Sequence, residues 1–273
     1  MVPRHEEGRA PIAVIKIGGS ILTGPISYAS AARFVERRLA KAADERLVVV
    51  VSAQNGMTDA LEREARTIVA EPERGALDLL WSTGEVRSVA LLALHLQLRG
   101  VAAAALSVQE TGIRLGEEQD GVAANAEFEL ERLRNALGRR RVAIVPGFFG
   151  VKRDGGIASL GRGGSDLTAV LLAARVGASR CELIKDVPGY FSADPNRDAR
   201  AAHLPRLTFA EALEMADEGC DLVQRRALEA AAEFGVPLVV RSLREDAPQS
   251  WVTAEAGEEN APGEPCDAEE AVT

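Results

Sequence analysis

Short apolar segments alternate with amphipathic ones along most of this 273-residue chain, and this alternation restricts its fold more than any other feature. The segments IAVIKI (12–17) and RLVVVVSA (46–53) are apolar at consecutive positions, which is typical of strands buried on both faces of a sheet. Segments 57–70 and 76–99 have helical periodicity. Right-handed crossovers then predict an α/β fold, a three-layer α/β/α sandwich with a mainly parallel central sheet.

The alternation continues to about residue 245. Further strands are expected at 101–108, 141–150, 180–187 and 236–242, and further helices at 128–140, 168–178, 208–219 and 221–235. We therefore expect one domain over 10–248. The stretch from Ala254 to Thr273 has seven acidic residues and no basic ones, with prolines and glycines among them. Such a composition predicts that residues 249–273 form an acidic, disordered tail.

Composition excludes several classes of function. The net charge of −9 argues against general nucleic-acid binding. No apolar run is long enough to span a membrane, and the N-terminus lacks the apolar segment of a signal peptide. Three cysteines and three histidines match no disulfide framework or metal pattern, so we expect a cytoplasmic protein without a protein-bound metal.

Ligands of parallel sheets bind beyond the carboxyl ends of the strands, so the loops that follow the strands are informative. The first strand ends in KIGGS, with Lys16, Gly18, Gly19 and Ser20. Adjacent glycines let backbone N–H groups approach an anion, and lysine supplies a positive charge. An ordinary glycine turn after a strand explains the same residues.

The strongest local signal is ASLGRGGSD (158–166) at the start of an apolar helix. Its functional candidates are Arg162, Gly163, Gly164, Ser165 and Asp166. A glycine-rich loop at a helix N-terminus is an anion site, and an arginine fork suits a carboxylate or a phosphate. A purely structural loop rarely needs several glycines and an arginine at one helix start.

Two weaker signals come from other segments. In VSAQNGMTD, Ser52, Thr58 and Asp59 surround an Asn-Gly turn, a pattern that also fits a helix cap. In STGE, Glu85 lies between apolar residues of a helix. A buried carboxylate there needs a partner, such as a cationic ligand group, whereas a solvated helix glutamate needs none.

The segment ELIKDVPGYFSADP (182–195) ends a strand with Lys185 and Asp186, which are followed by aromatic residues and Asp194. Either an ordinary surface turn or one wall of a ligand site explains this order. Only the other loops of the chain decide between them.

Seven segments together resemble the amino acid kinase family, and within it the catalytic domain of aspartokinase. They are KIGGS, VVVVSAQNGMTD, STGE, LSVQETGI, GFFG, SLGRGGSD and DVPGYFSADP. They occur in the order typical of the family and cover roughly residues 12–245. The domain over 10–248 is therefore expected to be an aspartokinase-like catalytic domain without the C-terminal regulatory domains, and hence without built-in feedback by lysine or threonine.

The resemblance implies a role for each matching residue. Lys16 would neutralise the transferring phosphoryl group and Asp166 would orient Lys16. Ser52, Thr58, Glu85, Arg162 and Ser165 would bind the amino-acid substrate, Glu85 through its α-ammonium group and Arg162 through its α-carboxylate. The nucleotide would contact Gly18, Gly19, Ser20, Gly163, Gly164, Lys185, Asp186, Phe191, Asp194 and Arg197. Phosphoryl transfer requires positioning and neutralisation of charge, which these residue types provide.

The chain departs from the family pattern at two informative places. Aspartokinases carry a nucleotide-contacting lysine in a GAKVLHPRA-like stretch, and the matching GCDLVQRRA (219–227) has Asp221 there. The family's TDVDGVY reads KDVPGYF, with Lys185 in place of threonine and Phe191 in place of tyrosine. We hypothesise that Lys185 supplies the positive charge that is lost at position 221.

The leading hypothesis is ATP-dependent phosphorylation of the side-chain carboxylate of L-aspartate, giving 4-phospho-L-aspartate and ADP, with Mg²⁺ bound through the nucleotide phosphates. Two alternatives stay open: the same chemistry on an aspartate analogue, and a catalytically weak regulatory subunit that binds a nucleotide or an amino acid. The resemblance also implies a homodimer, and a separate regulatory subunit remains compatible with the chain.

Overall fold

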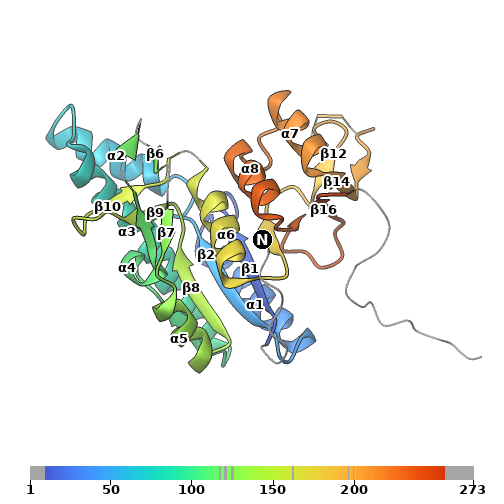
Figure 1. Ribbon diagram of the computed structural model, residues 1–273, viewed down its shortest axis with the longest axis horizontal. Helices are drawn as coiled ribbons and strands as arrows, with labels where there is room; N and C mark the ends of the chain where they lie inside the picture. Colours follow the sequence, from blue (N-terminus) through green and yellow to red (C-terminus); the bar gives the residue numbers. More distant parts are fainter. Residues whose placement is uncertain are drawn as a thin grey trace, which may run out of the picture.

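The structure is a computed structural model that describes residues 10–255 except 117, 120, 121, 124, 125, 162, 196 and 199. Its main sheet contains β1 (Ile12–Ile17), β2 (Arg46–Val51), β3 (Ala103–Ala105), β8 (Val142–Pro146), β11 (Cys181–Ile184), β14 (Arg206–Thr208), β15 (Leu238–Arg241) and β16 (Gln249–Thr253). These strands lie in the order β14-β16-β15-β11-β1-β2-β8-β3, and every pair except β15–β16 is parallel (Figure 1).

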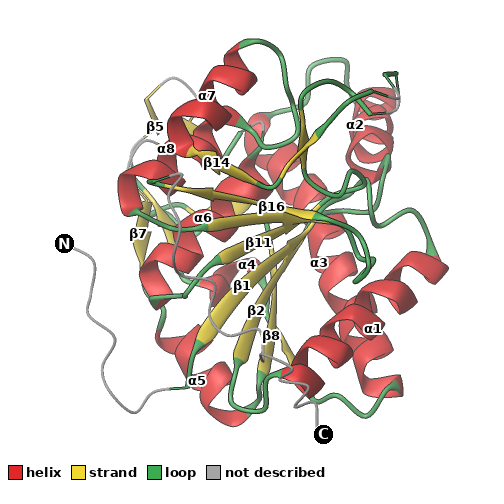
Figure 2. Ribbon diagram, turned by 90° about the vertical axis from the view of Figure 1, so that its right-hand side faces the viewer, coloured by secondary structure: helices red, strands yellow, loops and turns green. Residues whose placement is uncertain are grey.

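Helices cover both faces of this sheet. They are α1 (Pro25–Lys41), α2 (Met57–Ile68), α3 (Arg74–Leu98), α4 (Val108–Thr111), α5 (Glu131–Arg139), α6 (Gly164–Val176), α7 (Phe209–Asp217) and α8 (Arg225–Phe234). Helices α1 and α3 lie on one face, and α6 and α8 on the other (Figure 2). The prediction of a three-layer α/β fold with a mainly parallel sheet is confirmed. In the described part of the chain, no helix combines the length and apolarity needed to cross a membrane.

Strand β2 explains why the predicted strands are apolar at every position. Val48 and Val50 belong to the core under α5, α6 and α8, whereas Val49 and Val51 belong to the core under α1 and α3. All four side chains are fully buried. Because successive side chains point to opposite faces, a strand between two helical layers needs apolar residues throughout.

Several element boundaries differ from the sequence-based expectation. The segment 141–150 contains two strands, because the chain turns at Phe148, whose φ of 73° interrupts the strand. The expected strand 101–108 ends at Ala105, and Ser107 then begins α4 with a capping box. The folded domain also extends beyond residue 248, since β16 pairs with β15 and β14. Residues 256–273 of the expected tail lie outside the described residues.

Smaller sheets were not predicted at all. Strands β4 (Ile113–Leu115), β7 (Ala126–Phe128), β9 (Phe149–Val151) and β10 (Ile157–Ser159) form one of them, in the order β10-β9-β4-β7. Strands β12 (Tyr190–Phe191) and β13 (His203–Leu204) form an antiparallel pair within the segment that follows β11. These strands have two or three residues each, which is too short for a periodicity to be recognised.

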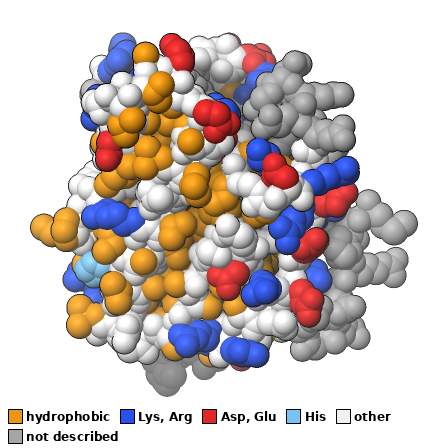
Figure 3. All heavy atoms as spheres, turned by 90° about the vertical axis from the view of Figure 1, so that its left-hand side faces the viewer, with side chains coloured by type: hydrophobic (Ala, Val, Ile, Leu, Met, Phe, Trp, Pro, Cys, Tyr) orange, Lys and Arg blue, Asp and Glu red, His pale blue; other side chains and the backbone are white. Residues whose placement is uncertain are grey.

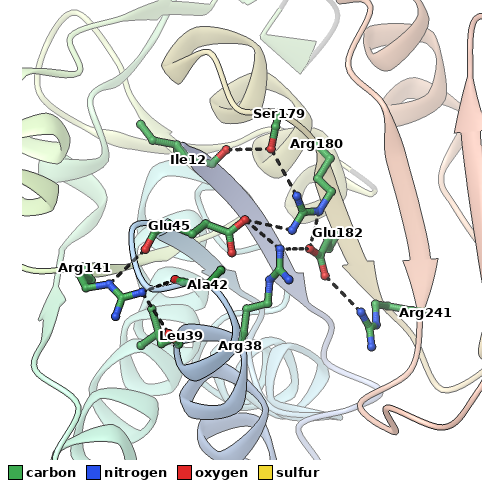
Figure 4. A network of polar contacts seen from close by, with 10 residues as sticks. All are labelled: Ile12, Arg38, Leu39, Ala42, Glu45, Arg141, Ser179, Arg180, Glu182 and Arg241. Carbon is green, nitrogen blue, oxygen red and sulfur yellow. Dashed lines mark hydrogen bonds and ion pairs between the residues drawn. The ribbon is translucent and has the colours of Figure 1, made fainter. Parts of the chain in front are cut away.

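A network of buried charges lies at the amino end of the main sheet (Figure 4). We call its members the amino-end cluster: Glu45, Glu182, Arg38, Arg180 and Arg241, of which Arg241 is the last residue of β15 and joins the others only through its side chain, 3.7 Å from Glu182. Arg180 lies 3.1 Å from Glu45 and 2.8 Å from Glu182. Arg38 lies 2.8 Å from Glu45 and 3.6 Å from Glu182, so each arginine bridges the two glutamates. The cluster therefore joins the start of β11 to α1 and to the turn before β2.

Apolar side chains gather on the face that lies on the left in Figure 1, where α2 and α3 are found (Figure 3). Among the exposed large hydrophobic residues are Leu79, Val86, Leu94 and Leu98. Their spacing puts them on one side of α3, opposite the residues that this helix buries. An exposed apolar stripe of this kind is typical of a surface that contacts another protein.

Candidate active site

Two lysines converge on one buried aspartate at the carboxyl end of the main sheet. Lys16 of β1 lies 2.7 Å from Asp166 Oδ1, and Lys185, directly after β11, lies 2.8 Å from Asp166 Oδ2. Asp166 is in the first turn of α6 and is only 3% exposed. These three residues and Glu85 are called the carboxyl-end cluster below.

The two ammonium groups keep Asp166 ionised. Burial alone would raise its pKa, but the positive charges of Lys16 and Lys185 outweigh burial and lower the pKa to about 2. For Lys185, burial lowers the pKa, and the attraction of Asp166 opposes that effect. Asp166 therefore holds both lysine side chains in place at neutral pH.

The KIGGS loop lies directly against Lys16. A side chain at Gly18 would place its Cβ 3.0 Å from Lys16 Nζ and 3.8 Å from the carbonyl oxygen of Ile184. A side chain at this position would therefore crowd the ammonium group that Asp166 holds in place. Gly19 approaches the loop after β2, where Ser52 N donates a hydrogen bond to Ile17 O at 3.1 Å. Ser20 is exposed.

Glu85 is buried within α3 and is 4% exposed. Burial raises its pKa to about 8, although a hydrogen bond from the backbone of Ala53 and the charge of Lys16 both lower it. Its Oε2 atom is buried without a hydrogen-bond partner among the described residues. A buried carboxyl group in this state can ionise when a cationic group binds beside it. The structure therefore excludes the alternative that Glu85 is a solvent-exposed glutamate of the helix surface.

The N-terminus of α6 is built from glycines. Gly163 is the N-cap residue with φ 75°, and a Cβ there would lie 2.5 Å from the side chain of Gln224. Ser165 is buried in the first turn of the helix and packs against Gly147. Arg226 donates a hydrogen bond to Leu160 O at 2.7 Å, so the first turn of α8 lies against this loop.

Other predicted site residues are less closely joined to the cluster. Phe191 contacts the ring of His203 at 5.2 Å, and Arg197 pairs with Asp194 at 3.3 Å on the exposed surface. Asp186 is exposed beside Lys185. Ser52 and Thr58 are half-buried in the segment that follows β2, and Gly164 is buried as the first residue of α6. Arg162 lies outside the described residues.

The structure adds site residues that sequence reasoning missed. The amide of Ala53 binds Glu85, but a backbone donor leaves no signal in residue type. Tyr190 is 1% exposed, and its hydroxyl has no hydrogen-bond partner among the described residues. Burial first, and then the nearby Cys220 and Asp166, raise the pKa of this tyrosine. Tyrosine directly after a Pro-Gly turn could have suggested a buried ring, but not its neighbours.

Two lysines, a glycine loop and a helix N-terminus at the carboxyl end of a parallel sheet are features typical of α/β proteins that bind anionic ligands. A sequence model of the amino acid kinase family matches residues 11–242. The chain therefore belongs to the amino acid kinase family, as the resemblance predicted. An aspartokinase from Geobacillus stearothermophilus is 38% identical over 248 residues, which are 91% of this chain and 60% of that protein. The chain thus spans less than two thirds of the length of this relative.

Solved structures agree with the sequence relatives. Aspartate kinase from Synechocystis has a TM-score of 0.78 and 35% identity, covering 92% of this chain and 41% of its own. Aspartokinase III from E. coli, in complex with aspartate and ADP, has a TM-score of 0.72 and 27% identity, covering 90% of this chain and 65% of its own.

Proposed function

We propose that this chain transfers the γ-phosphoryl group of ATP to the side-chain carboxylate of L-aspartate, giving 4-phospho-L-aspartate and ADP. The observation that carries the proposal is the pairing of a candidate anion site with a candidate cation site in one cluster: the two lysines on Asp166, and the buried Glu85, whose Oε2 atom has no hydrogen-bond partner in the described part of the chain. An amino-acid acceptor needs one site for each α-group. Relatives named aspartokinase, and the complex of E. coli aspartokinase III with aspartate and ADP, support the same substrates.

In this mechanism the residues act through position and charge. An oxygen of the acceptor carboxylate attacks the γ-phosphorus while the bond to the bridging oxygen of ADP breaks. Lys16 offsets the charge on the transferring group, because the two reactants are both anions. Glu85 would accept the α-ammonium group and Arg162 the α-carboxylate, with Ser52, Thr58 and Ser165 around the reacting carboxylate. Mg²⁺ bound to the phosphates would supply further positive charge.

The nucleotide would lie across the loops after β1 and β11. The glycines at 18, 19, 163 and 164 allow a close approach of backbone amides to the phosphates, and Ser20 adds a hydroxyl. Phe191 would pack beside the base, with Asp186, Asp194 and Arg197 along the same edge. The resemblance of these segments to the aspartokinase motifs supports these assignments.

The direct test is an ADP-release assay with a panel of acceptors, combined with trapping of the acyl phosphate by hydroxylamine. We expect turnover that depends on L-aspartate, a hydroxamate product, and loss of both in Lys16→Ala. Lys41→Ala is the matched control, since Lys41 is an exposed lysine of α1. Turnover with an aspartate analogue but not with aspartate would mean that the analogue is the acceptor. No turnover with any acceptor would refute the proposal.

We also infer that the chain pairs with a second copy through the α3 stripe. Leu79 and Leu98 are at its two ends, and Val86 and Ala90 are exposed near its middle. Antiparallel pairing about a twofold axis would therefore place Leu79 of one copy against Leu98 of the other, as an isologous interface requires. Light scattering should give a dimer for the native chain and a monomer for Leu94→Glu with Leu98→Glu. A monomeric native chain would refute the inference.

A further inference from the structure

The chain uses lysine in a very restricted way. Of its 32 basic residues only four are lysines: Lys16, Lys41, Lys152 and Lys185. Lys41 and Lys152 are partly exposed, with side chains 64% and 35% accessible. The side chains of Lys16 and Lys185 are only 9% and 12% accessible, and both contact Asp166. The cations of the amino-end cluster are all arginines, whereas the two cations that contact Asp166 are both lysines.

The sheet brings the two buried lysines to the same face. Lys16 is the register partner of Leu183 in the parallel β1–β11 pair. Lys185 lies two residues beyond Leu183, and side chains two residues apart along a strand point the same way. Its backbone N–H donates to Arg241 O at 2.8 Å, which continues the pairing with β15 and fixes where the side chain starts. The ammonium of Lys185 is therefore presented one step further toward the carboxyl end than that of Lys16.

The charges of this cluster do not balance. Among the described residues of the cluster, two ammonium groups face a single ionised carboxylate, and Glu85 is largely protonated at neutral pH because burial raises its pKa to about 8. Asp186 is the other acidic group that acts on Lys185, and it is exposed to solvent. The partly positive N-terminus of α6 lies at the same place and adds to the excess. The cluster therefore has an excess of positive charge that the part of the chain described by the structure does not neutralise, which favours the binding of an anion.

We propose that Lys185 is a second phosphate-directed cation, which acts beside Lys16 on the β- and γ-phosphates of the nucleotide. The proposal rests on the proposed function, since it names a further binding residue of the same site. Asp166 would hold the two ammonium groups at fixed positions, one on each carboxylate oxygen. Lysine suits this role because it is a compact point charge with further donors free after one contact with Asp166.

Nucleotide binding tests this role without any acceptor. Isothermal titration of the full chain should compare ATP, ADP and AMP for the native protein, Lys185→Met, Lys185→Arg and the control Lys152→Met. We expect Lys185→Met to weaken ATP and ADP about 10- to 100-fold, the usual range for a lost charge-assisted contact, and AMP less than about threefold. Lys185→Arg should recover most of the loss. Lys152→Met should bind all three as the native chain does.

Equal weakening of ATP, ADP and AMP in Lys185→Met, or unchanged binding of all three, would overturn the proposal and leave Lys185 with a structural role. Amine labelling of the native chain covers the case in which Lys185→Met does not fold. ATP should slow acylation of Lys185, AMP should not, and Lys41 should react equally in both. Absence of ATP-specific protection would overturn the proposal. These binding and labelling experiments contain no acceptor, so their results can be interpreted even if the assay with aspartate shows no turnover.

Discussion

The main sheet has a buried charge cluster at each end, and the two differ in what surrounds them. At the amino end, Arg180 and Arg38 bridge Glu45 and Glu182, and the neighbouring Arg141 donates to Leu39 O and Ala42 O, in and just after the last turn of α1. At the carboxyl end, Lys16 and Lys185 meet Asp166 at the N-terminus of α6. The amino-end cluster has three arginines and two glutamates, and at the carboxyl end two lysines face one ionised carboxylate, because the raised pKa of Glu85 keeps that residue largely protonated at neutral pH.

The difference lies in the polarity of the helices. In a parallel α/β fold the helices end near the amino edge of the sheet and begin near its carboxyl edge. At the amino edge, helix carbonyls supply partial negative charge that arginine forks can satisfy. At the carboxyl edge, helix N–H groups add partial positive charge to that of the lysines. The helix carbonyls therefore compensate the excess positive charge at the amino end, whereas we expect a bound anion to compensate it at the carboxyl end.

Removing a cation from the carboxyl end should cause the largest loss of activity. Lys16→Ala should reduce kcat about 10³- to 10⁵-fold, the range found when a cation that stabilises a transferring phosphoryl group is removed. Lys16 is also a contact of Asp166, so folding must be checked by circular dichroism alongside the ADP-release assay. A variant that folds and retains more than a tenth of native turnover would contradict the role of Lys16.

Removing a cation from the amino end should affect stability instead. Arg180→Met leaves Glu45 and Glu182 buried with one partner fewer, and breaking a buried pair costs on the order of 3–5 kcal/mol. Urea denaturation should measure this loss, while KM for ATP and for aspartate should stay native in the folded fraction. A change of more than about threefold in either KM would contradict the separation of the two ends.

Neutralising Glu85 should have a smaller effect that depends on pH. Burial raises its pKa to about 8, so the free protein carries it mostly protonated at pH 7. Pairing with an α-ammonium favours the ionised form, so aspartate binding should release up to about 0.9 proton at pH 7. Titrations in buffers of different ionisation enthalpy measure this number. Glu85→Gln should abolish the release and raise KM for aspartate about 10- to 100-fold.

The sign of the linked stability effect gives a control. Because the pKa of Glu85 is raised on folding, its contribution to stability is fully present below its unfolded value of 4.5 and is lost as pH rises through about 8. The free energy of unfolding of the native chain should therefore fall over this interval, and Glu85→Gln should flatten the decline. Proton uptake on aspartate binding, or a native slope in Glu85→Gln, would contradict this account.

The sequence predicted the layers of the fold, but not the contacts among the candidate site residues. Consecutive apolar residues in 12–17 and 46–53 predicted the buried strands because both sheet faces are covered. The lysines, the glycines and Glu85 were named as site candidates from the loops after the strands and from the resemblance to aspartokinase, and their roles stay predictions. The contact of Lys185 with Asp166 depends on the register of β1 with β11, and the donor from Ala53 is backbone. Neither leaves a trace in residue type, and the strands of the small sheets are too short to show one.

The smallest expected effect concerns the place where the family lysine is absent. Asp221 is exposed in the loop before α8, and Gln224 of the same loop lies against Gly163 at the start of α6. If the carboxyl end already receives its second positive charge from Lys185, then Asp221→Lys adds only an exposed, screened charge, worth about 0–1 kcal/mol. ATP affinity should then rise less than about fivefold at low salt, and the gain should disappear near 0.5 M salt, where the Debye length is only a few ångströms.

Glu218→Lys, also exposed at the end of α7, controls for net charge. A gain above about 20-fold that persists at high salt, and that Glu218→Lys lacks, would mean that the anion site was short of a cation and that Lys185 does not fill the position.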